Sequence, residues 1–414
     1  MEEELIREIR HRIAEQLDYS EAKSDEELVE MIEEEVFSSD SAIGWTAREK
    51  AYAIRRLYHS FRGLDVLQPL IDDKTISEIM INSHREIFIE KAGQVTSCPT
   101  VFEDSQKLED IIQSIVSKVN RVVNESSPIV DARLPDGSRV NVVLPPIALK
   151  GPTMTIRKFP DKPMTMDDLV DRGALTEEAA ELLAMLVKAK YNIFIGGGTG
   201  SGKTTFLNAL SDFIPPDERI ITIEDSAELQ IKTVPNLVSL ETRNANTEGK
   251  GEIGIRDLIR TSLRMRPNRI IVGEVRGAEA LDMLQAMNTG HEGSISTGHS
   301  NSSSDMISRL ETMVLSGADL PLDVVRKQIA SAIDIMVHLT RLRDKSRRVT
   351  EISEVTGMRG GEVQLKPLFL FREEGSEKGS VTGTLQPTGN RISRTGKWYS
   401  AGFSDVRWCE PSSS

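Results

Sequence analysis

Hydrophobic residues in the first 63 positions recur at helical spacing. The first series repeats every four residues, which predicts an amphipathic helix with one apolar face. Its members are Leu5, Ile9, Ile13 and Leu17. Capping boxes at Ser24–Glu27 and Thr46–Glu49 predict the starts of two further helices, the second running to Val36 and the third ending near Gly63. We therefore predict a helical region over residues 1–63.

The second of these helices is strongly acidic. Its glutamates are Glu26, Glu27, Glu30 and Glu33 to Glu35. A run of this kind is usually a solvated helix face, which is the interpretation we favour, and a docking surface for a basic partner is the alternative. The sequence leaves both interpretations open.

From about Leu64 the apolar pattern changes to period two. Residues 78–82 and 86–90 are predicted strands, followed by a helix with an apolar stripe between Leu108 and Val119. A tight turn is predicted over 131–139, feeding further strands at 140–144 and 153–158. These elements predict a small α+β domain over residues 64–160, and Pro160 and Pro163 mark a linker.

Apolar strands and helical stretches alternate after residue 161. The strands are expected to begin at Ile193, Arg219, Arg269 and Ser294, with helices over 176–190 and 255–265. This alternation predicts a mostly parallel sheet covered on both faces. Three more strands are predicted from Ile335 to Phe371, which gives a third domain over 161–371.

Residues 372–414 are predicted to form a polar, glycine-rich extension anchored by Trp398 and Trp408. The predicted fold class is thus α/β: a large nucleotide-binding type of domain, preceded by a smaller α+β domain and an N-terminal helical segment.

Composition narrows the classes of protein that fit this organisation. The chain has 51 basic and 64 acidic residues among 414, a formal net charge of −13, which argues against nucleic acid as a direct partner. No run approaches the ~18 apolar residues of a membrane span, and the start Met1–Glu4 is not a basic signal peptide. Two cysteines, Cys98 and Cys409, suggest a reducing compartment. We expect a cytoplasmic protein that meets membranes only through partners.

Strand, glycine-rich turn and helix occur in direct succession at Ile193–Leu210. The turn fits the phosphate-loop (P-loop) pattern, in which backbone N–H groups and a helix N-terminus bind a nucleoside triphosphate. Lys203 is placed to reach the β- and γ-phosphates, and Thr204 to offer a hydroxyl to Mg²⁺. The predicted cofactors are ATP and Mg²⁺. The predicted binding residues are Gly197, Gly198, Thr199, Gly200, Ser201, Gly202, Lys203, Thr204 and Thr205.

Acidic residues end two of the predicted strands. Glu224 follows the strand that begins at Arg219, and Glu274 follows the strand that begins at Arg269. Ligands of open α/β sheets bind at this edge, where a carboxylate can hold Mg²⁺, directly or through water, or polarise water. His299 ends the next strand and could contact the γ-phosphate. His291 and His299 lack a recognisable zinc spacing, so a structural histidine is the alternative for each.

Three arginines are expected at turns and strand ends of the smaller domain. They are Arg133, Arg139 and Arg157, the last followed by Lys158. A planar guanidinium suits the charge that develops on a γ-phosphoryl group. Ordinary surface solubility explains them equally well.

Taken together, these motifs resemble the secretion ATPase superfamily, and within it the CpaF/TadA ATPases of tight-adherence (Flp-type) pili. The resemblance covers roughly Gly63 to Phe371. It rests on an arginine-turn segment and three boxes that are typical of the superfamily. These are Asp131–Asn141 with Thr155–Phe159, the Asp box Thr222–Asp225, the Walker B segment Val272–Gly277, and the His box Ser296–Asn301.

The resemblance implies a RecA-like ATPase domain, a homo-hexameric ring and an inner-membrane platform protein as partner. It implies catalytic roles for Lys203, Glu224, Glu274 and His299, and phosphate contacts from Arg133, Arg139 and Arg157, in the same or an adjacent subunit. Two glycines depart from the family pattern: Gly298, expected to loosen the strand that carries His299, and Gly196, expected to add freedom before the P-loop.

The sequence therefore predicts an ATP-hydrolysing motor for pilus assembly or protein secretion across a bacterial or archaeal envelope. A conjugation or type IV secretion ATPase, or a DNA-translocating motor, is the alternative within enzymes. A nucleotide-sensing assembly scaffold with little turnover is the alternative from another class.

Overall fold

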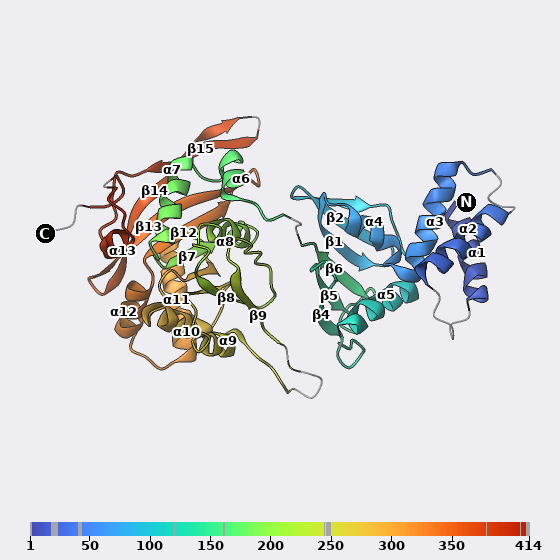
Figure 1. The fold of residues 1–414 in the computed structure, drawn as a ribbon, viewed down its shortest axis with the longest axis horizontal. Helices are drawn as coiled ribbons and strands as arrows, with labels where there is room; N and C mark the ends of the chain where they lie inside the picture. The colour runs from blue at the N-terminus through green and yellow to red at the C-terminus, as the bar shows by residue number, and fades with distance from the viewer. Residues whose placement is uncertain are drawn as a thin grey trace. The chain divides into compact units, whose positions relative to one another are not determined.

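The computed structural model describes residues 2–17, 24–39, 44–119, 121–159, 162–243, 245, 250–377, 379–405 and 407–410. The chain divides into two compact units, Met1–Asp161 and Lys162–Ser414, which Figure 1 colours from blue to green and from green to red. Residues 160 and 161, where a domain boundary was predicted, lie outside the described part of the chain.

Three helices open the first unit: α1 (Glu2–Gln16), α2 (Asp25–Ser38) and α3 (Ala47–Arg62). Both predicted capping boxes are confirmed, because Ser24 and Thr46 each accept from the N3 amide while Glu27 and Glu49 reach back to the cap amide. The helices share a separate apolar core that includes Ile9, Ile32 and Leu57. The predicted helical region therefore exists, and it has its own hydrophobic centre.

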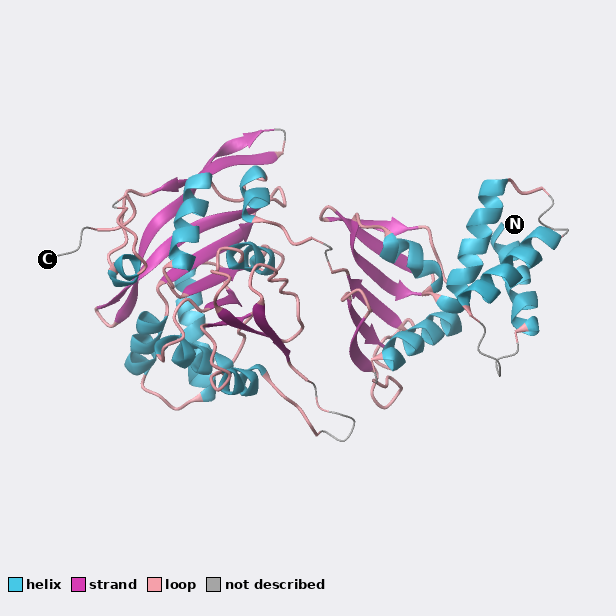
Figure 2. Cartoon of the chain, in the orientation of Figure 1, coloured by secondary structure: helices cyan, strands magenta, loops and turns pink. Residues whose placement is uncertain are grey.

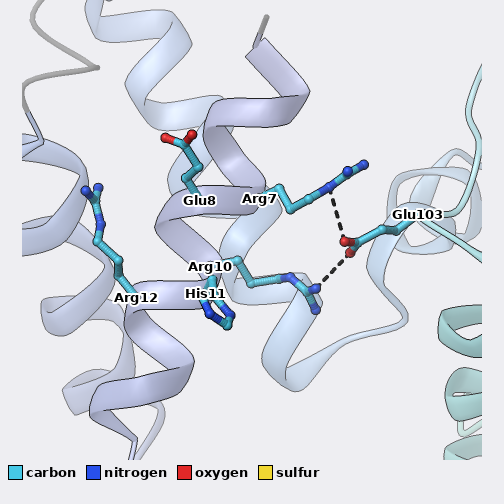
Figure 3. Close-up of a pocket in the computed structure, with 6 residues that line it drawn as sticks. All are labelled: Arg7, Glu8, Arg10, His11, Arg12 and Glu103. Atoms are coloured by element: carbon cyan, nitrogen blue, oxygen red, sulfur yellow. Dashed lines mark hydrogen bonds and ion pairs between the residues drawn. The ribbon is translucent and has the colours of Figure 1, made fainter.

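Ion pairs join this helical region to the rest of the first unit. Glu103, just before helix α5 (Ser105–Lys118), accepts from Arg7 at 3.1 Å and from Arg10 at 2.7 Å. Figure 3 shows both guanidinium groups of α1 converging on this carboxylate, beside a pocket of about 480 Å³. Buried Asp65 likewise pairs with Arg56 of α3 and with Lys107 of α5. We interpret the pocket as part of this ion-pair cluster, since the carboxylate of Glu103 is already paired with the guanidinium groups of Arg7 and Arg10.

The rest of the first unit is a six-stranded sheet in the order β3-β2-β1-β6-β5-β4. Its elements are η2 (Asp65–Leu67), α4 (Gln68–Asp72), β1 (Ile76–Ser83), β2 (Glu86–Lys91), β3 (Gln94–Cys98), α5, β4 (Ile129–Arg133), β5 (Arg139–Val143) and β6 (Thr153–Arg157). The sequence placed residues 131–139 in a turn, and this was wrong for 131–133, which belong to β4 and pair with β5 as part of an edge strand. The true turn is shorter because the amides of Gly137 and Leu134 close it within residues 134–138.

The second unit contains a nine-stranded sheet in the order β15-β14-β13-β12-β7-β11-β10-β8-β9. Strands β12, β7, β11, β10, β8 and β9 are parallel neighbours, whereas β12 to β15 form an antiparallel meander. The strands are β7 (Ile193–Gly197), β8 (Arg219–Glu224), β9 (Asn236–Glu241), β10 (Arg269–Val272), β11 (Ile295–His299), β12 (Ile335–Arg341), β13 (Arg347–Arg359), β14 (Glu362–Glu377) and β15 (Ser380–Pro387).

Helices cover both faces of this sheet, as the alternating pattern predicts (Figure 2). They are α6 (Met166–Asp171), α7 (Glu177–Lys188), α8 (Lys203–Ser211), α9 (Ile255–Ser262), α10 (Glu279–Asn288), α11 (Ser303–Gly317), α12 (Leu322–Ala332) and α13 (Gly396–Ser400). Strand β7 is buried on both sides, because Ile193 and Ile195 belong to the core with α7 and α8 while Phe194 belongs to the core with α10 and α11.

The segment after residue 371 continues this unit. The predicted boundary at 371/372 falls inside β14, and β15 adds a further strand that the sequence did not predict. Trp398 and Trp408 are buried in the same core as β7, as predicted for anchors. Two buried carboxylates fix the tail: Asp334 accepts from Lys397 at 2.8 Å, and Glu354 accepts from the amide of Arg394 at 2.7 Å.

Candidate functional site

The glycine-rich turn between β7 and α8 has the backbone geometry that a P-loop requires. Gly200 and Gly202 lie in the left-handed region, with φ of 71° and 96°, where a side chain would strain the backbone. At Gly197 a Cβ atom would lie only 2.4 Å from the carbonyl oxygen of Leu339 in β12. These positions explain why glycine stands at each of them. Helix α8 begins directly at Lys203, so its N-terminal amides face the turn.

Lys203 is buried, and three acceptors surround its ammonium group. Its Nζ lies 3.1 Å from the carbonyl oxygen of Gly197, 3.2 Å from that of Gly198 and 3.2 Å from Nδ1 of His299. Burial lowers the pKa of Lys203, and the carboxylate of Glu274 opposes that shift. The ammonium group is thus held at the mouth of the loop by neutral acceptors.

His299 connects this lysine to Glu274. Its Nε2 lies 2.8 Å from Oε1 of Glu274, on the opposite side of the ring from Lys203. Burial, and secondarily Lys203, lowers the pKa of His299, so the ring is neutral near pH 7. Since Nδ1 then accepts from the ammonium group, Nε2 must carry the proton and face the carboxylate. The structure brings together three residues that the sequence predicted separately.

Two further residues extend this series of contacts. Arg276 donates from Nη2 to Oε2 of Glu274 at 2.9 Å, and its Nη1 lies 3.5 Å from Asp225. Sequence analysis included Asp225 in the Asp box and Arg276 in the Walker B segment but did not assign a role to either residue. Asp225 follows β8 and Arg276 follows β10, which are hydrogen-bonded neighbours.

Glu224 is buried, and its contacts are with its own loop. Oε1 accepts from the amides of Glu228 at 2.8 Å and Leu229 at 3.1 Å, and the side chain lies over Gly273, where a Cβ would come within 2.8 Å of its Cγ. Burial raises the pKa of Glu224 to about 7, although both amides favour the charged form. In this structure the carboxylate orders the loop after β8, and a metal role for it stays a prediction.

The raised pKa of Glu224 gives a pH dependence of stability. The pKa rises from 4.5 in the unfolded chain to about 7 in the fold, so its stabilising contribution is complete below pH 4.5 and is lost as the pH rises through about 7. We expect Glu224→Gln to gain stability relative to wild type on going from pH 5 to pH 8, by on the order of 3 kcal/mol. Thermal melting at both pH values measures this, with exposed Glu252→Gln as the control. Equal pH profiles for wild type and Glu224→Gln would contradict the assignment.

A pocket of about 240 Å³ opens beside the P-loop. Its lining residues are Gly198, Thr199, His299, Ser300, Asn301, Asp305 and Arg309. The hydroxyl oxygen of Ser300, one of these lining residues, is buried without a hydrogen-bond partner, which fits a site that binds a polar group. The glycine backbone and Arg309 suit a phosphate, whereas Asp305 adds an acidic group to the lining. Among the described residues, no group of three or more His, Cys, Asp or Glu side chains could hold a metal ion. The assignment of Thr204, Glu224 and Glu274 to Mg²⁺ stays a prediction.

Gly196 and Gly298 occupy neighbouring positions in the β7–β11 register. A Cβ on Gly298 would lie 3.0 Å from Met306, and one on Gly196 would lie 2.7 Å from Oγ of Ser300. The strand that carries His299 is regular through this point, so the expected loosening is not seen. Both glycines permit close packing behind the P-loop.

The three predicted arginines lie side by side in the first unit. Arg133 pairs in register with Arg139, and Arg139 with Arg157, across β4, β5 and β6. Residues directly opposite one another in a sheet point to the same face. The strands therefore gather three guanidinium groups that the sequence could only place on separate elements. Their contact with a nucleotide stays a prediction.

His291 lies away from the series of contacts around Lys203. Its Nδ1 is 3.3 Å from the carbonyl oxygen of Ala286 at the end of α10. This contact fits the alternative interpretation, in which His291 has a structural role only.

Comparisons with known proteins place the chain in a family. A family model described as "Type II/IV secretion system protein" matches residues 61–387. A Mycobacterium tuberculosis protein named for conjugal transfer is 36% identical over 309 residues, covering 72% of this chain and 86% of its own. Conjugal transfer protein TrbB of Rhizobium radiobacter is 35% identical over 325 residues, covering 78% and 96%. The structure of the Legionella pneumophila ATPase DotB matches with a TM-score of 0.51 at 22% identity, covering 70% of this chain and 79% of that one.

Proposed function

The chain belongs to the type II/IV secretion system protein family, and from this premise we propose that it is an ATP-hydrolysing motor of a type IV secretion or conjugal-transfer machine. The observation that carries the proposal is the series of contacts from Lys203 through His299 to Glu274, directly at the end of the P-loop strand. It joins a phosphate-binding cation to an acid that can orient water.

Each residue has a definite role in this proposal. The P-loop amides, Lys203 and Thr205 bind the phosphates of ATP, and Thr204 and Glu274 hold Mg²⁺. Bound Mg²⁺ would neutralise charge that develops on the transferred phosphoryl group. Glu274 accepts a proton from the attacking water, and neutral His299 links that carboxylate to Lys203. Loss of the γ-phosphate next to Lys203 would therefore affect the ends of two strands, because His299 ends β11 and Glu274 follows β10.

The relatives favour conjugation or type IV secretion over the pilus interpretation that the sequence alone favoured. The names of the matching Mycobacterium and Rhizobium proteins refer to conjugal transfer, and a Brucella suis type IV secretion protein, VirB11, is 33% identical over 303 residues. A tight-adherence pilus motor of the CpaF/TadA kind remains the second candidate, because the arginine-turn and box motifs of the sequence support it.

The assembly is also part of the proposal. No described helix combines the length and hydropathy that crossing a membrane requires. We propose a homo-hexameric ring at the cytoplasmic face of an inner membrane, attached through a platform protein. The arginines Arg133, Arg139 and Arg157 then complete the nucleotide site, either within a subunit or from its neighbour.

Phosphate release by the purified full-length chain tests the function. We expect Mg²⁺-dependent ATP hydrolysis. The rate per subunit should rise with protein concentration, because rings form at higher concentration. A chain that binds ATP in a ring but shows no turnover, with or without membranes that contain the secretion machinery, would contradict the motor and support the scaffold alternative.

The same assay separates the motor alternatives. The formal net charge of −13 argues against DNA as the track, so single- or double-stranded DNA should leave the rate unchanged. Salt-sensitive stimulation by DNA would instead support a DNA-translocating motor.

A further inference from the structure

A basic hairpin lies against the P-loop. Strands β12 and β13 pair so that Arg341 stands opposite Arg347, next to the hairpin turn. Strand β12 also runs parallel to β7, with Leu339 opposite Gly197. Arg341 therefore lies two residues beyond the point at which β7 gives way to the P-loop. This register brings both arginines to the glycine-rich turn.

Arg347 makes a direct contact with the loop backbone. Its Nε donates to the carbonyl oxygen of Gly200 at 2.9 Å. Its Cδ lies 3.4 Å from where a Cβ on Gly202 would be, and Arg341 Nη1 lies 3.6 Å from where a Cβ on Gly200 would be. Both side chains thus lie close to the residues whose backbone is left-handed.

The contact fixes the orientation of one peptide group. The C=O and N–H of a trans peptide point in opposite directions. With the carbonyl of Gly200 directed at Arg347, the N–H of Ser201 faces the other side, where it donates to the carbonyl oxygen of Gly198 at 3.3 Å. That side of the turn is the inner side of the loop, where phosphate oxygens are bound in P-loops.

The hairpin that carries Arg347 is itself held in place. Asp344 in its turn accepts from the amides of Ser346 at 2.9 Å and Val381 at 2.7 Å. Arg343 pairs with Glu373 of β14, and Arg348 donates to the carbonyl of Gly173. Arg347 therefore projects from a fixed support, so its contact with Gly200 constrains the loop and not merely the arginine.

We propose that Arg347 is a positioning residue for nucleotide binding, which holds the Gly200–Ser201 peptide in its phosphate-binding orientation, with Arg341 adding positive charge at the same edge. The inference rests on the proposed function for the P-loop itself. It extends the nucleotide site to the β12–β13 hairpin, about 140 residues further along the chain.

Binding of fluorescent ADP and ATP analogues to the full-length chain tests this. We expect Arg347→Ala to raise the Kd for both nucleotides about tenfold, as for loss of a hydrogen bond to a charged donor that organises the site, while turnover at saturating ATP stays close to wild type. Arg347→Lys should recover most of the affinity, because its ammonium can donate to the same carbonyl. Arg359→Ala removes an exposed arginine from the opposite end of β13 and is the matched control, expected to bind like wild type.

The outcomes separate this inference from the proposed function. Unchanged affinity in Arg347→Ala, or an equal loss in Arg359→Ala, overturns the role of Arg347 while the ATPase assignment stands. A wild-type chain that binds neither ADP nor ATP overturns the proposed function and the inference together. Melting of the nucleotide-free variants at the wild-type temperature shows that altered binding does not arise from unfolding.

Discussion

Replacing Glu274 by Gln is expected to lower the rate of ATP hydrolysis by about 10²–10⁴, the usual contribution of a positioned general base, while ATP still binds. Glutamine keeps the size of the side chain and can still accept from Arg276, which contacts Glu274 at 2.9 Å. It lacks the negative charge that accepts a proton from water. It also changes the partner of His299, whose Nε2 lies 2.8 Å from the carboxylate. Single-turnover phosphate release and equilibrium ATP binding measure the two effects separately.

Glu279→Gln is the matched control for this experiment. Glu279 lies five residues further along the chain, and its Oε1 accepts from the amides of Arg276 at 2.6 Å and Gly277 at 2.9 Å. It should retain most of the activity, since it holds the start of α10 and does not contact His299. Near-normal turnover in Glu274→Gln, or an equal loss in both variants, would remove Glu274 from the catalytic role.

The substitution Arg157→Ala is expected to have the second large effect on ATP hydrolysis. We expect kcat to fall by about 10³–10⁵, as for arginines that complete phosphoryl-transfer sites in other enzymes, with a much smaller change in the Kd for ATP. The physical reason is that Arg133, Arg139 and Arg157 are paired in register across three adjacent strands. In the proposed site, a guanidinium group from this row would offset the charge that develops on the γ-phosphoryl group. Lys150→Ala, which removes an exposed cation of the same unit, should leave turnover unchanged.

A mixing experiment shows whether these arginines act between subunits. Lys203→Ala disables the nucleotide site but leaves Arg157 intact, and Arg157→Ala has the opposite defect. If the arginine acts across a subunit interface, mixed rings contain some sites with both groups and recover activity. If the mixture stays inactive while each variant still forms rings, the arginine acts within its own subunit. Unchanged turnover in Arg157→Ala alone would exclude a catalytic role.

Features that depend on neighbouring residues were predictable from the chain alone. The capping boxes at Ser24 and Thr46 formed as predicted, because the bonds of a cap join residues three apart. The P-loop turn between β7 and α8 was predictable for the same reason: its glycines, Lys203 and the start of the helix are contiguous. The alternation of strands and helices likewise predicted a sheet covered on both faces.

Features that depend on strand register were not predictable in this way. Strand β4 was taken for a turn because its pairing with β5, and not its own propensity, makes it a strand. The tail after residue 371 has a polar sequence, yet it adds β15 to the sheet. It also buries Trp398, because the few apolar residues of the tail pack against a core formed by segments distant in sequence.

The sequence by itself determined that the chain carries a P-loop and which acids and histidine follow the strands of its sheet, since each of these is a local pattern. Only the tertiary structure decided that Lys203, His299 and Glu274 contact one another, that Arg276 joins Asp225 to that group, and that Arg347 lies against Gly200. The reason is physical: the order β12-β7-β11-β10-β8 places residues up to about 140 positions apart at one edge of a sheet, and that order is fixed by packing of the whole unit.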